Sequence, residues 1–130
     1  MAHAATSIAE DRPLTVAERE MVLWLLEHGG EEGKKHLRQL ARARVVSRCS
    51  CGCASVDFSI DGQVASPKSG MSIVSDYRWD DADGKLFGIF AFVREGLLSG
   101  IDLWSIDGRG IASTLPTLAS FGQWTNDRAV

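Results

Sequence analysis

The sequence has no apolar run that approaches the roughly 20 residues of a membrane-spanning helix. The segment from Met1 to Pro13 lacks a basic start and a following apolar stretch, so it does not resemble a signal peptide. The cysteines lack the pattern of a secreted disulfide framework, because they are three, an odd number, and stand at alternate positions. These absences predict a protein of the reducing cytoplasm that does not enter a membrane.

A recognisable catalytic motif is also missing. Gly88, Gly96 and Gly100 do not form a phosphate-binding fingerprint. The acidic turn at residues 80–84 has neither the spacing of a calcium loop nor the glutamate that closes one. The sequence therefore assigns no catalytic residue, and it favours a non-enzymatic protein.

Length and composition predict one folded domain. The chain has 130 residues, of which 45% are hydrophobic and 24% charged, an ordinary globular balance. A chain of this length buries roughly two-thirds of its unfolded surface, enough for a core without disulfides or metals. Residues 1–13 are small and polar, so we expect a flexible N-terminus followed by a single α+β domain over residues 14–130.

Two helices are expected near the N-terminus. Thr15 and Glu18 have the spacing of a capping box, in which each side chain binds the backbone N–H of the other residue. Apolar residues at helical spacing follow, and Gly29-Gly30 supplies the residue type that ends helices. A second helix is expected from Glu31 to about Ala43.

Strands are expected from Val45 onward, where the apolar pattern changes to a period of two. Further strands are expected at residues 56–60, 71–79, 86–93 and 97–106. Short turns between them predict an antiparallel sheet of about five strands, with the two N-terminal helices packed on one face. The strand at residues 86–93 is apolar on both faces, so the C-terminal tail or a second copy of the chain must cover the other face. Monomer and homodimer both remain open.

The cysteines form the most distinctive local pattern. Cys49, Cys51 and Cys53 would point to one side of an extended chain, where three thiolates could bind a soft metal such as Cu(I) or supply three of the four zinc ligands. A reactive thiol at Cys51 or Cys53 is a second possibility, since Arg44 and Arg48 are near in sequence and cations lower a thiol pKa. The third is that the cysteines are small apolar side chains packed at a strand turn.

Two groups of side chains suit a protein partner. Lys34, Arg38 and Arg42 recur at every fourth position of the expected second helix and could bind an acidic surface. Trp79 and Trp104 lie in strands that also carry acidic residues, as large aromatics of protein interfaces often do. Nucleic acid is the less favoured partner, because exposed aromatics do not alternate with basic residues in the strands.

Three segments together resemble a group of small bacterial proteins that has no assigned activity. They are the helix from Glu18 to Glu27 with its W-L-L core, the V-V-x-R-C-x-C-G-C-x-S-V-D-F run from Val45 to Phe58, and G-I-D-L-W-S-I-D-G from Gly100 to Gly108. The expected architecture is also similar to that of many immunity proteins of bacterial polymorphic toxin systems. This second similarity implies a protein that masks a partner, and it assigns no individual residue.

Two functions therefore follow from the sequence. The first is a protein-binding factor, immunity-like or regulatory, that uses the basic helix or the acidic and aromatic strand residues. The alternative is a metal- or thiol-dependent protein centred on Cys49, Cys51 and Cys53, with zinc or copper as the cofactor.

Overall fold

The computed structural model describes residues 7–121 as three α-helices, six strands and a short 3-10 helix. In chain order these are β1 (Ser7–Pro13), α1 (Val16–Glu27), α2 (Gly30–Lys35), α3 (Leu37–Leu40), β2 (Ala43–Cys49), β3 (Val56–Ile60), β4 (Met71–Asp80), β5 (Leu86–Arg94), β6 (Leu97–Ser105) and η1 (Leu118–Ser120). None of the described helices is long and apolar enough to span a membrane.

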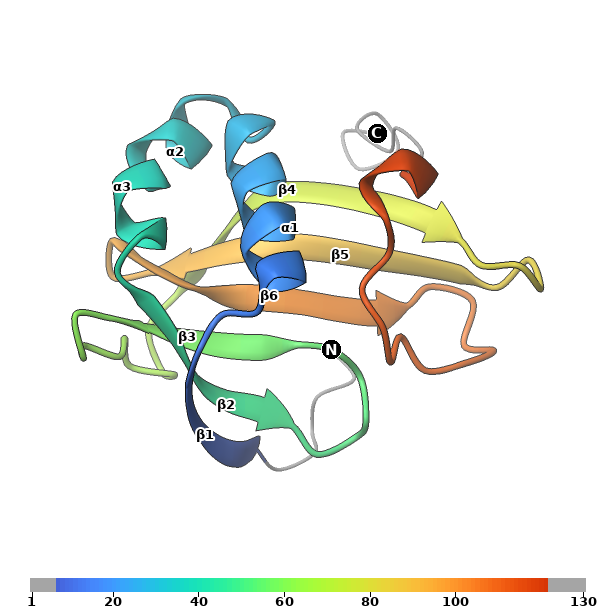
Figure 1. Ribbon diagram of the computed structural model, residues 1–130, viewed down its shortest axis with the longest axis horizontal. Helices are drawn as coiled ribbons and strands as arrows, with labels where there is room; N and C mark the ends of the chain where they lie inside the picture. The colour runs from blue at the N-terminus through green and yellow to red at the C-terminus, as the bar shows by residue number, and fades with distance from the viewer. Residues whose placement is uncertain (1–6, 122–130) are drawn as a thin grey trace.

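The six strands form one antiparallel sheet in the order β1-β2-β3-β6-β5-β4. The three α-helices lie together on one face of this sheet (Figure 1). The predicted α+β architecture, with helices on one face of an antiparallel sheet, is therefore confirmed in outline. The numbers of elements differ from the expectation of about five strands and two helices, since the structure has six strands and three α-helices among the described residues.

The additional strand is β1, within the segment expected to be flexible. Residues 7–13 pair with β2, from Ser7 opposite Cys49 to Pro13 opposite Arg44, and residues 1–6 lie outside the described part of the chain. The residues of β1 are mostly exposed, so the strand has little of the apolar alternation that marks a strand in sequence. Its acidic residues instead pair with β2, Glu10 with Arg48 and Asp11 with Arg44.

The additional helix arises because the expected helix at residues 31–43 is interrupted at His36. There the backbone N–H bonds to the carbonyl of Gly33 rather than to that of Glu32. The carbonyl of Glu32 is instead 2.8 Å from Nδ1 of the buried His36 ring. The His36 side chain thus occupies the Glu32 carbonyl, which the His36 backbone N–H would use in a continuous helix. Two short helices result.

Helix α1 is fixed at its start by the predicted capping box, which is confirmed. The N–H of Glu18 donates to Thr15 Oγ1 at 3.0 Å, and the N–H of Thr15 donates to Glu18 Oε1 at 2.9 Å. Arg12, from β1, also donates to both carboxylate oxygens of Glu18, at 2.8 and 3.0 Å. Glu18 therefore joins the helix start to the edge of the sheet.

The core lies between α1 and the sheet. Met21, Val22, Leu25 and Leu26 of α1 are buried against alternate residues of the strands. In β4 the side chains do not alternate regularly between the two faces of the sheet, because the register shifts between Ile73 and Ser75. Val74, Tyr77 and Trp79 consequently belong to the core, whereas Met71 and Ile73 are exposed.

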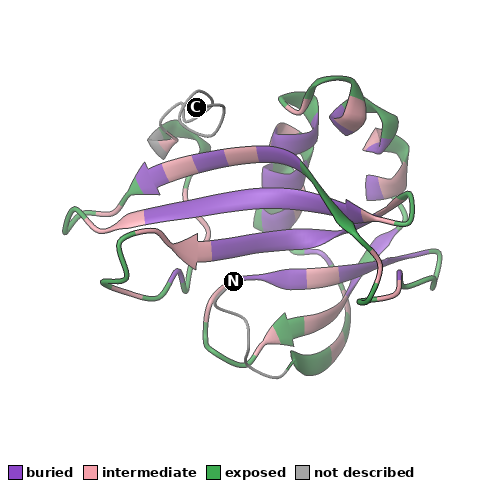
Figure 2. Ribbon diagram, turned by 180° about the vertical axis from the view of Figure 1, so that it is seen from behind, coloured by how far each residue is buried: buried purple, intermediate pink, exposed green. Residues whose placement is uncertain are grey.

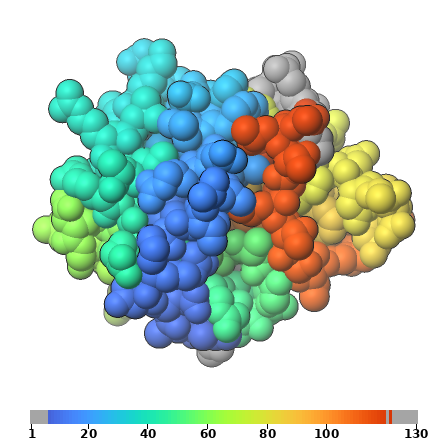
Figure 3. Space-filling view, viewed as in Figure 1, coloured from blue at the N-terminus to red at the C-terminus, as the bar shows by residue number. Residues whose placement is uncertain are grey.

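The C-terminal segment covers the same face as the helices. Residues 109–121 run beside α1 (Figure 3), and the Phe121 ring lies 5.0 Å from Trp24 and 5.7 Å from Tyr77, centroid to centroid. Leu115 packs against the core as well. The described part of the tail therefore does not supply the second cover that was expected for β5.

The opposite face of β5 is buried by aromatic rings that lie on glycines. Figure 2 shows this face, with the described helices all behind the sheet. The Trp104 indole lies so close to Gly88, its cross-strand neighbour, that a Cβ there would stand 2.8 Å from Nε1. The Phe92 ring lies against Gly100 in the same way, because a Cβ at Gly100 would stand 2.9 Å from Cζ of Phe92. Glycine in these two strands thus makes room for flat packing of large side chains.

The environment of Glu18 leads to a prediction about stability. Burial opposes ionisation of Glu18, but hydrogen bonds from Arg12 and Thr15 outweigh it and hold the pKa below its ordinary value of 4.5. Ionised Glu18 therefore stabilises the fold above pH 4.5, and this contribution is lost as the pH falls through the lower folded-state pKa. Replacing Glu18 by Gln should lower the free energy of unfolding at pH 7 by about 1–3 kcal/mol, with a smaller difference from the unsubstituted protein at pH 3. Urea denaturation at both pH values measures this.

Glu20→Gln is the matched control, because Glu20 is an exposed carboxylate on the same helix. It should leave the unfolding free energy within about 0.5 kcal/mol of the original. Equal losses in the two variants would contradict the role given to Glu18.

Candidate metal centre

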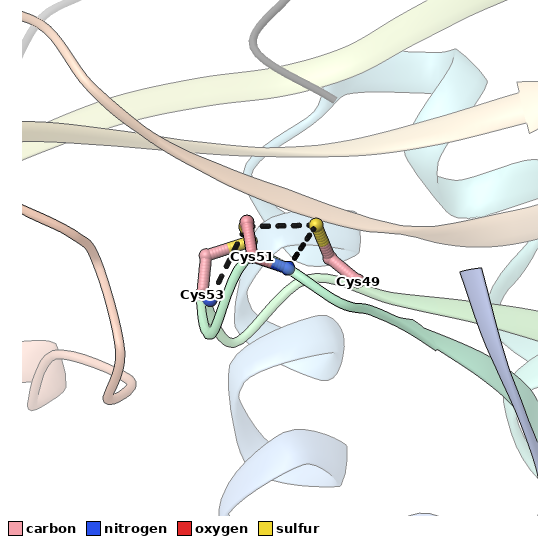
Figure 4. A group of neighbouring side chains, drawn as sticks. All are labelled: Cys49, Cys51 and Cys53. Atoms are coloured by element: carbon pink, nitrogen blue, oxygen red, sulfur yellow. Dashed lines mark hydrogen bonds between the residues drawn. The ribbon is translucent and has the colours of Figure 1, made fainter. Parts of the chain in front are cut away.

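The three cysteines lie in the connection between β2 and β3. Cys49 is the last residue of β2, and Cys51 and Cys53 follow in the turn that leads to Val56 (Figure 4). A backbone hydrogen bond holds the turn at each end. The N–H of Cys49 donates to the carbonyl of Ser55 at 3.4 Å, and the N–H of Ala54 donates to the carbonyl of Ala112 at 2.8 Å.

Ser55 is the principal anchor of the turn, and it is buried. Its hydroxyl accepts the N–H of Leu103 in β6 at 2.8 Å and lies 2.9 Å from Oδ1 of Asp102 and 3.2 Å from the carbonyl of Leu103. The Cys53 thiol donates to the same hydroxyl at 3.2 Å. The cysteine turn is thereby fixed to an interior strand of the sheet.

The sulfur atoms of Cys49, Cys51 and Cys53 all lie within 4.8 Å of one another. Those of Cys49 and Cys51 are 2.7 Å apart, longer than the roughly 2.05 Å of a disulfide bond, and all three cysteines are reduced. Backbone N–H groups also point at the sulfurs, from Cys51 to Cys49 at 3.3 Å and from Cys53 to Cys51 at 3.4 Å. The expectation that the three side chains gather on one side is met.

Burial and the neighbouring thiols raise the pKa values of Cys49 and Cys53, so both side chains are protonated at neutral pH. Burial, together with the neighbouring thiols of Cys51 and Cys53, raises the pKa of Cys49 to about 12. Burial and the Cys51 thiol also raise the pKa of Cys53, although the hydrogen bond from Cys53 to Ser55 acts in the opposite direction. The raised pKa of Cys53 argues against the reactive thiol predicted there, and the same prediction for Cys51 stays a prediction. Arg44 and Arg48 pair with Asp11 and Glu10.

Among the described residues, no histidine or carboxylate joins the cysteines in a metal-binding group. His28 stacks on Trp24, with ring centroids 3.9 Å apart, and His36 is buried at the α2–α3 junction with its Nδ1 on Glu32. His3 lies outside the described residues. The described residues therefore offer a site of three sulfur ligands.

The predicted basic surface is divided by the fold. Lys34 is in α2, Arg38 in α3 and Arg42 beyond α3, so the three exposed residues do not share one helix face. Arg42 also forms an ion pair with Asp61. The predicted partner-binding role of Lys34, Arg38 and Arg42 stays a prediction.

Trp79 and Trp104 lie on opposite faces of the sheet. Trp79 is buried in the core beside Phe87, with ring centroids 5.4 Å apart, whereas Trp104 is half-buried on the face away from the helices. The two therefore do not form one aromatic surface. Asp102, an acidic residue of the strand that carries Trp104, is buried beside Ser55.

Ser55 is the part of the site that sequence reasoning missed. It stands two residues after Cys53, and an isolated serine in a turn carries no motif. Its importance comes from the pairing of β3 with β6, which was not foreseen. No family model, curated protein or solved structure matches the chain.

The raised pKa of Cys49 predicts slow alkylation. In reduced, metal-free protein at pH 8, Cys49 should react with iodoacetamide at least about tenfold more slowly than in the urea-unfolded chain, because the thiolate is the nucleophile. Trypsin cleavage after Arg48 and Lys68 yields one peptide with all three cysteines, and its fragment ions identify the modified residue. Equal rates in folded and unfolded protein would refute the protected state of Cys49.

Proposed function

We propose that this protein binds a soft metal ion, Cu(I), through Cys49, Cys51 and Cys53. The observation that supports the proposal is the convergence of three sulfur atoms within 4.8 Å on a turn fixed to the sheet. Thiolate sulfur is a soft ligand that favours Cu(I) and zinc over harder metal ions.

The dimensions of the cluster suit one ion. Metal–thiolate bonds of about 2.3 Å place three sulfurs roughly 4 Å apart around an ion at their centre. The sulfurs of this cluster lie within that range, except that the 2.7 Å between Cys49 and Cys51 must widen. Cys51 is exposed and stands in the turn, so its side chain has room to move.

The ligand count favours Cu(I) over zinc. Structural zinc sites have four ligands, and cysteine pairs in them are usually separated by two or more residues. The described residues supply three sulfurs at alternate positions. Three thiolates also carry more negative charge than one Cu(I) ion neutralises, and the N–H groups of Cys51 and Cys53 that point at sulfur would offset part of the excess.

Binding would exchange protons for the ion. Because the pKa values of Cys49 and Cys53 are raised, these groups are thiols at neutral pH and must lose their protons to become ligands. Affinity should therefore increase with pH. The exposed Cys51 is the ligand that a donor or acceptor of the ion would reach first, so the site suits a protein that takes up and passes on the ion.

The protein-binding function rests on weaker support. The basic residues named for it are distributed over separate segments, and Arg42 has an ion-pair partner within the chain. It remains a prediction, for which charge reversal at Arg38 is the test once a partner is known.

The proposal predicts one Cu(I) per chain. Reduced protein should withdraw Cu(I) from the chromophoric chelator bicinchoninate, and Cys49→Ser, Cys51→Ser and Cys53→Ser should each weaken binding by more than the roughly 10–100-fold that loss of an outer-shell partner costs. Absorbance of the chelator complex in an anaerobic titration measures both quantities. Circular dichroism establishes that each variant is folded.

His28→Gln is the control, since it removes an exposed imidazole that lies outside the cysteine group. Its affinity for Cu(I) should match that of the unsubstituted protein. No competition with the chelator, or Zn(II) binding that is equally tight and equally sensitive to the three substitutions, would overturn the proposal of a Cu(I) site.

A further inference from the structure

We propose that Cys49 and Cys51 form a reversible dithiol–disulfide pair, and that forming the disulfide releases the ion from the cluster. The release rests on the proposed Cu(I) function, whereas the disulfide itself can be tested without metal. The observation that carries the inference is the 2.7 Å between the two sulfurs, close enough that a small movement brings them to bonding distance.

The backbone permits this bond. Successive Cα atoms are about 3.8 Å apart, so those of residues two apart are separated by at most about 7.6 Å, and a turn shortens this toward the roughly 4.4–6.8 Å that a disulfide spans. Strand β2 ends at Cys49, and the chain turns through the next residues. Gly52, with φ of +96°, follows Cys51 and has no neighbour within 4 Å of a would-be Cβ, so the turn can adjust on its outer side.

The three thiols differ in what holds them. Cys53 donates its thiol proton to Ser55, which is buried and bound to β6. Cys51 is exposed, and its N–H donates to the Cys49 sulfur at 3.3 Å. This arrangement favours Cys49 and Cys51 as the oxidised pair and leaves Cys53 as the remaining thiol.

The oxidant is a low-molecular-weight disulfide such as glutathione disulfide. The exposed Cys51 sulfur, as thiolate, attacks one sulfur of the oxidant, which breaks the oxidant's S–S bond, releases one thiol and leaves a mixed disulfide on Cys51. The Cys49 sulfur then attacks the Cys51 sulfur, releases the second thiol and forms the Cys49–Cys51 bond. Two electrons pass from the protein sulfurs to the oxidant, and the two protons of the cysteine thiols go to the two released thiols.

Oxidation removes two of the three ligands in one event. Neither sulfur of a disulfide is a thiolate, so only Cys53 would remain to hold Cu(I). The copper stays Cu(I) throughout, because the electrons come from sulfur alone. The cluster would then retain the ion under reducing conditions and lose it under oxidising ones.

Equilibration of metal-free protein in glutathione redox buffers tests the first step. As the buffer becomes more oxidising, an intrachain disulfide should appear, and after alkylation the peptide of residues 49–68 should carry one label, on Cys53. Cys53→Ser should form the same disulfide at a similar buffer ratio. Cys49→Ser should remain reduced at the ratio that oxidises the unsubstituted protein.

Several results would overturn the assignment of the pair. They are a chain that stays fully reduced in the most oxidising buffer, a bond between Cys51 and Cys53, and a Cys49→Ser variant that oxidises as readily as the original. Size-exclusion chromatography under non-reducing conditions distinguishes an intrachain bond from crosslinked chains, and a crosslinked product alone would also overturn it.

Cu(I) competition on the oxidised protein tests the release. Its affinity should fall by more than the roughly 10–100-fold that loss of an outer-shell partner costs and return when the disulfide is reduced. Unchanged affinity would overturn the release. If the reduced protein binds no Cu(I), the proposed function fails, and the redox titration still decides whether the dithiol pair exists.

Discussion

Strand β5 must be kept from water on both of its faces, and the arrangement of the molecule follows from how each face is covered. On one side, α1 and the segment that ends at Phe121 supply a conventional apolar layer. On the other side, Phe92 and Trp104 lie flat on glycines of the neighbouring strand. This face is covered without a further helix or strand, because the large rings of Phe92 and Trp104 lie over glycine positions, which have no side chain.

The position of the cysteines depends on this sheet in a direct way. Strand β3 pairs with β6, which pairs with β5, so the turn before β3 is attached to the interior of the sheet. Ser55 makes the attachment local, since one hydroxyl binds the backbone of Leu103 and also receives the Cys53 thiol. A cluster of three sulfurs on a free loop would have many arrangements. Here its first residue belongs to a strand and its last is bonded to a buried anchor, which reduces the entropy lost when a ligand orders the turn.

Much of the fold could be predicted from local patterns. The capping box of α1, the antiparallel sheet and the interior position of β5 each depend on residues close together in sequence. The errors have long-range causes. Strand β1 is held by pairs such as Glu10 with Arg48, and a charged strand has no apolar alternation to reveal it. The register shift in β4 leaves Met71 and Ile73 exposed, and the apolar pattern of the sequence does not reveal such a shift. For the site, the alternate spacing predicted that the sulfurs would gather, but Ser55 matters only because β6 lies beside it.

The edge strand β1 has a consequence for how the chain can be shortened. Because residues 1–13 are small and polar, they are an obvious segment to delete from the protein. Deleting them would make β2 the edge strand of the sheet and would leave its backbone N–H and C=O groups exposed to another molecule. The deletion would also remove Arg12, which donates to Glu18 at the start of α1, and Ser7, which lies opposite Cys49 in the sheet. A trimmed chain should therefore self-associate through β2, beside the residues that carry the sulfur cluster, so segment deletion is a poor way to separate the fold of this protein from its chemistry.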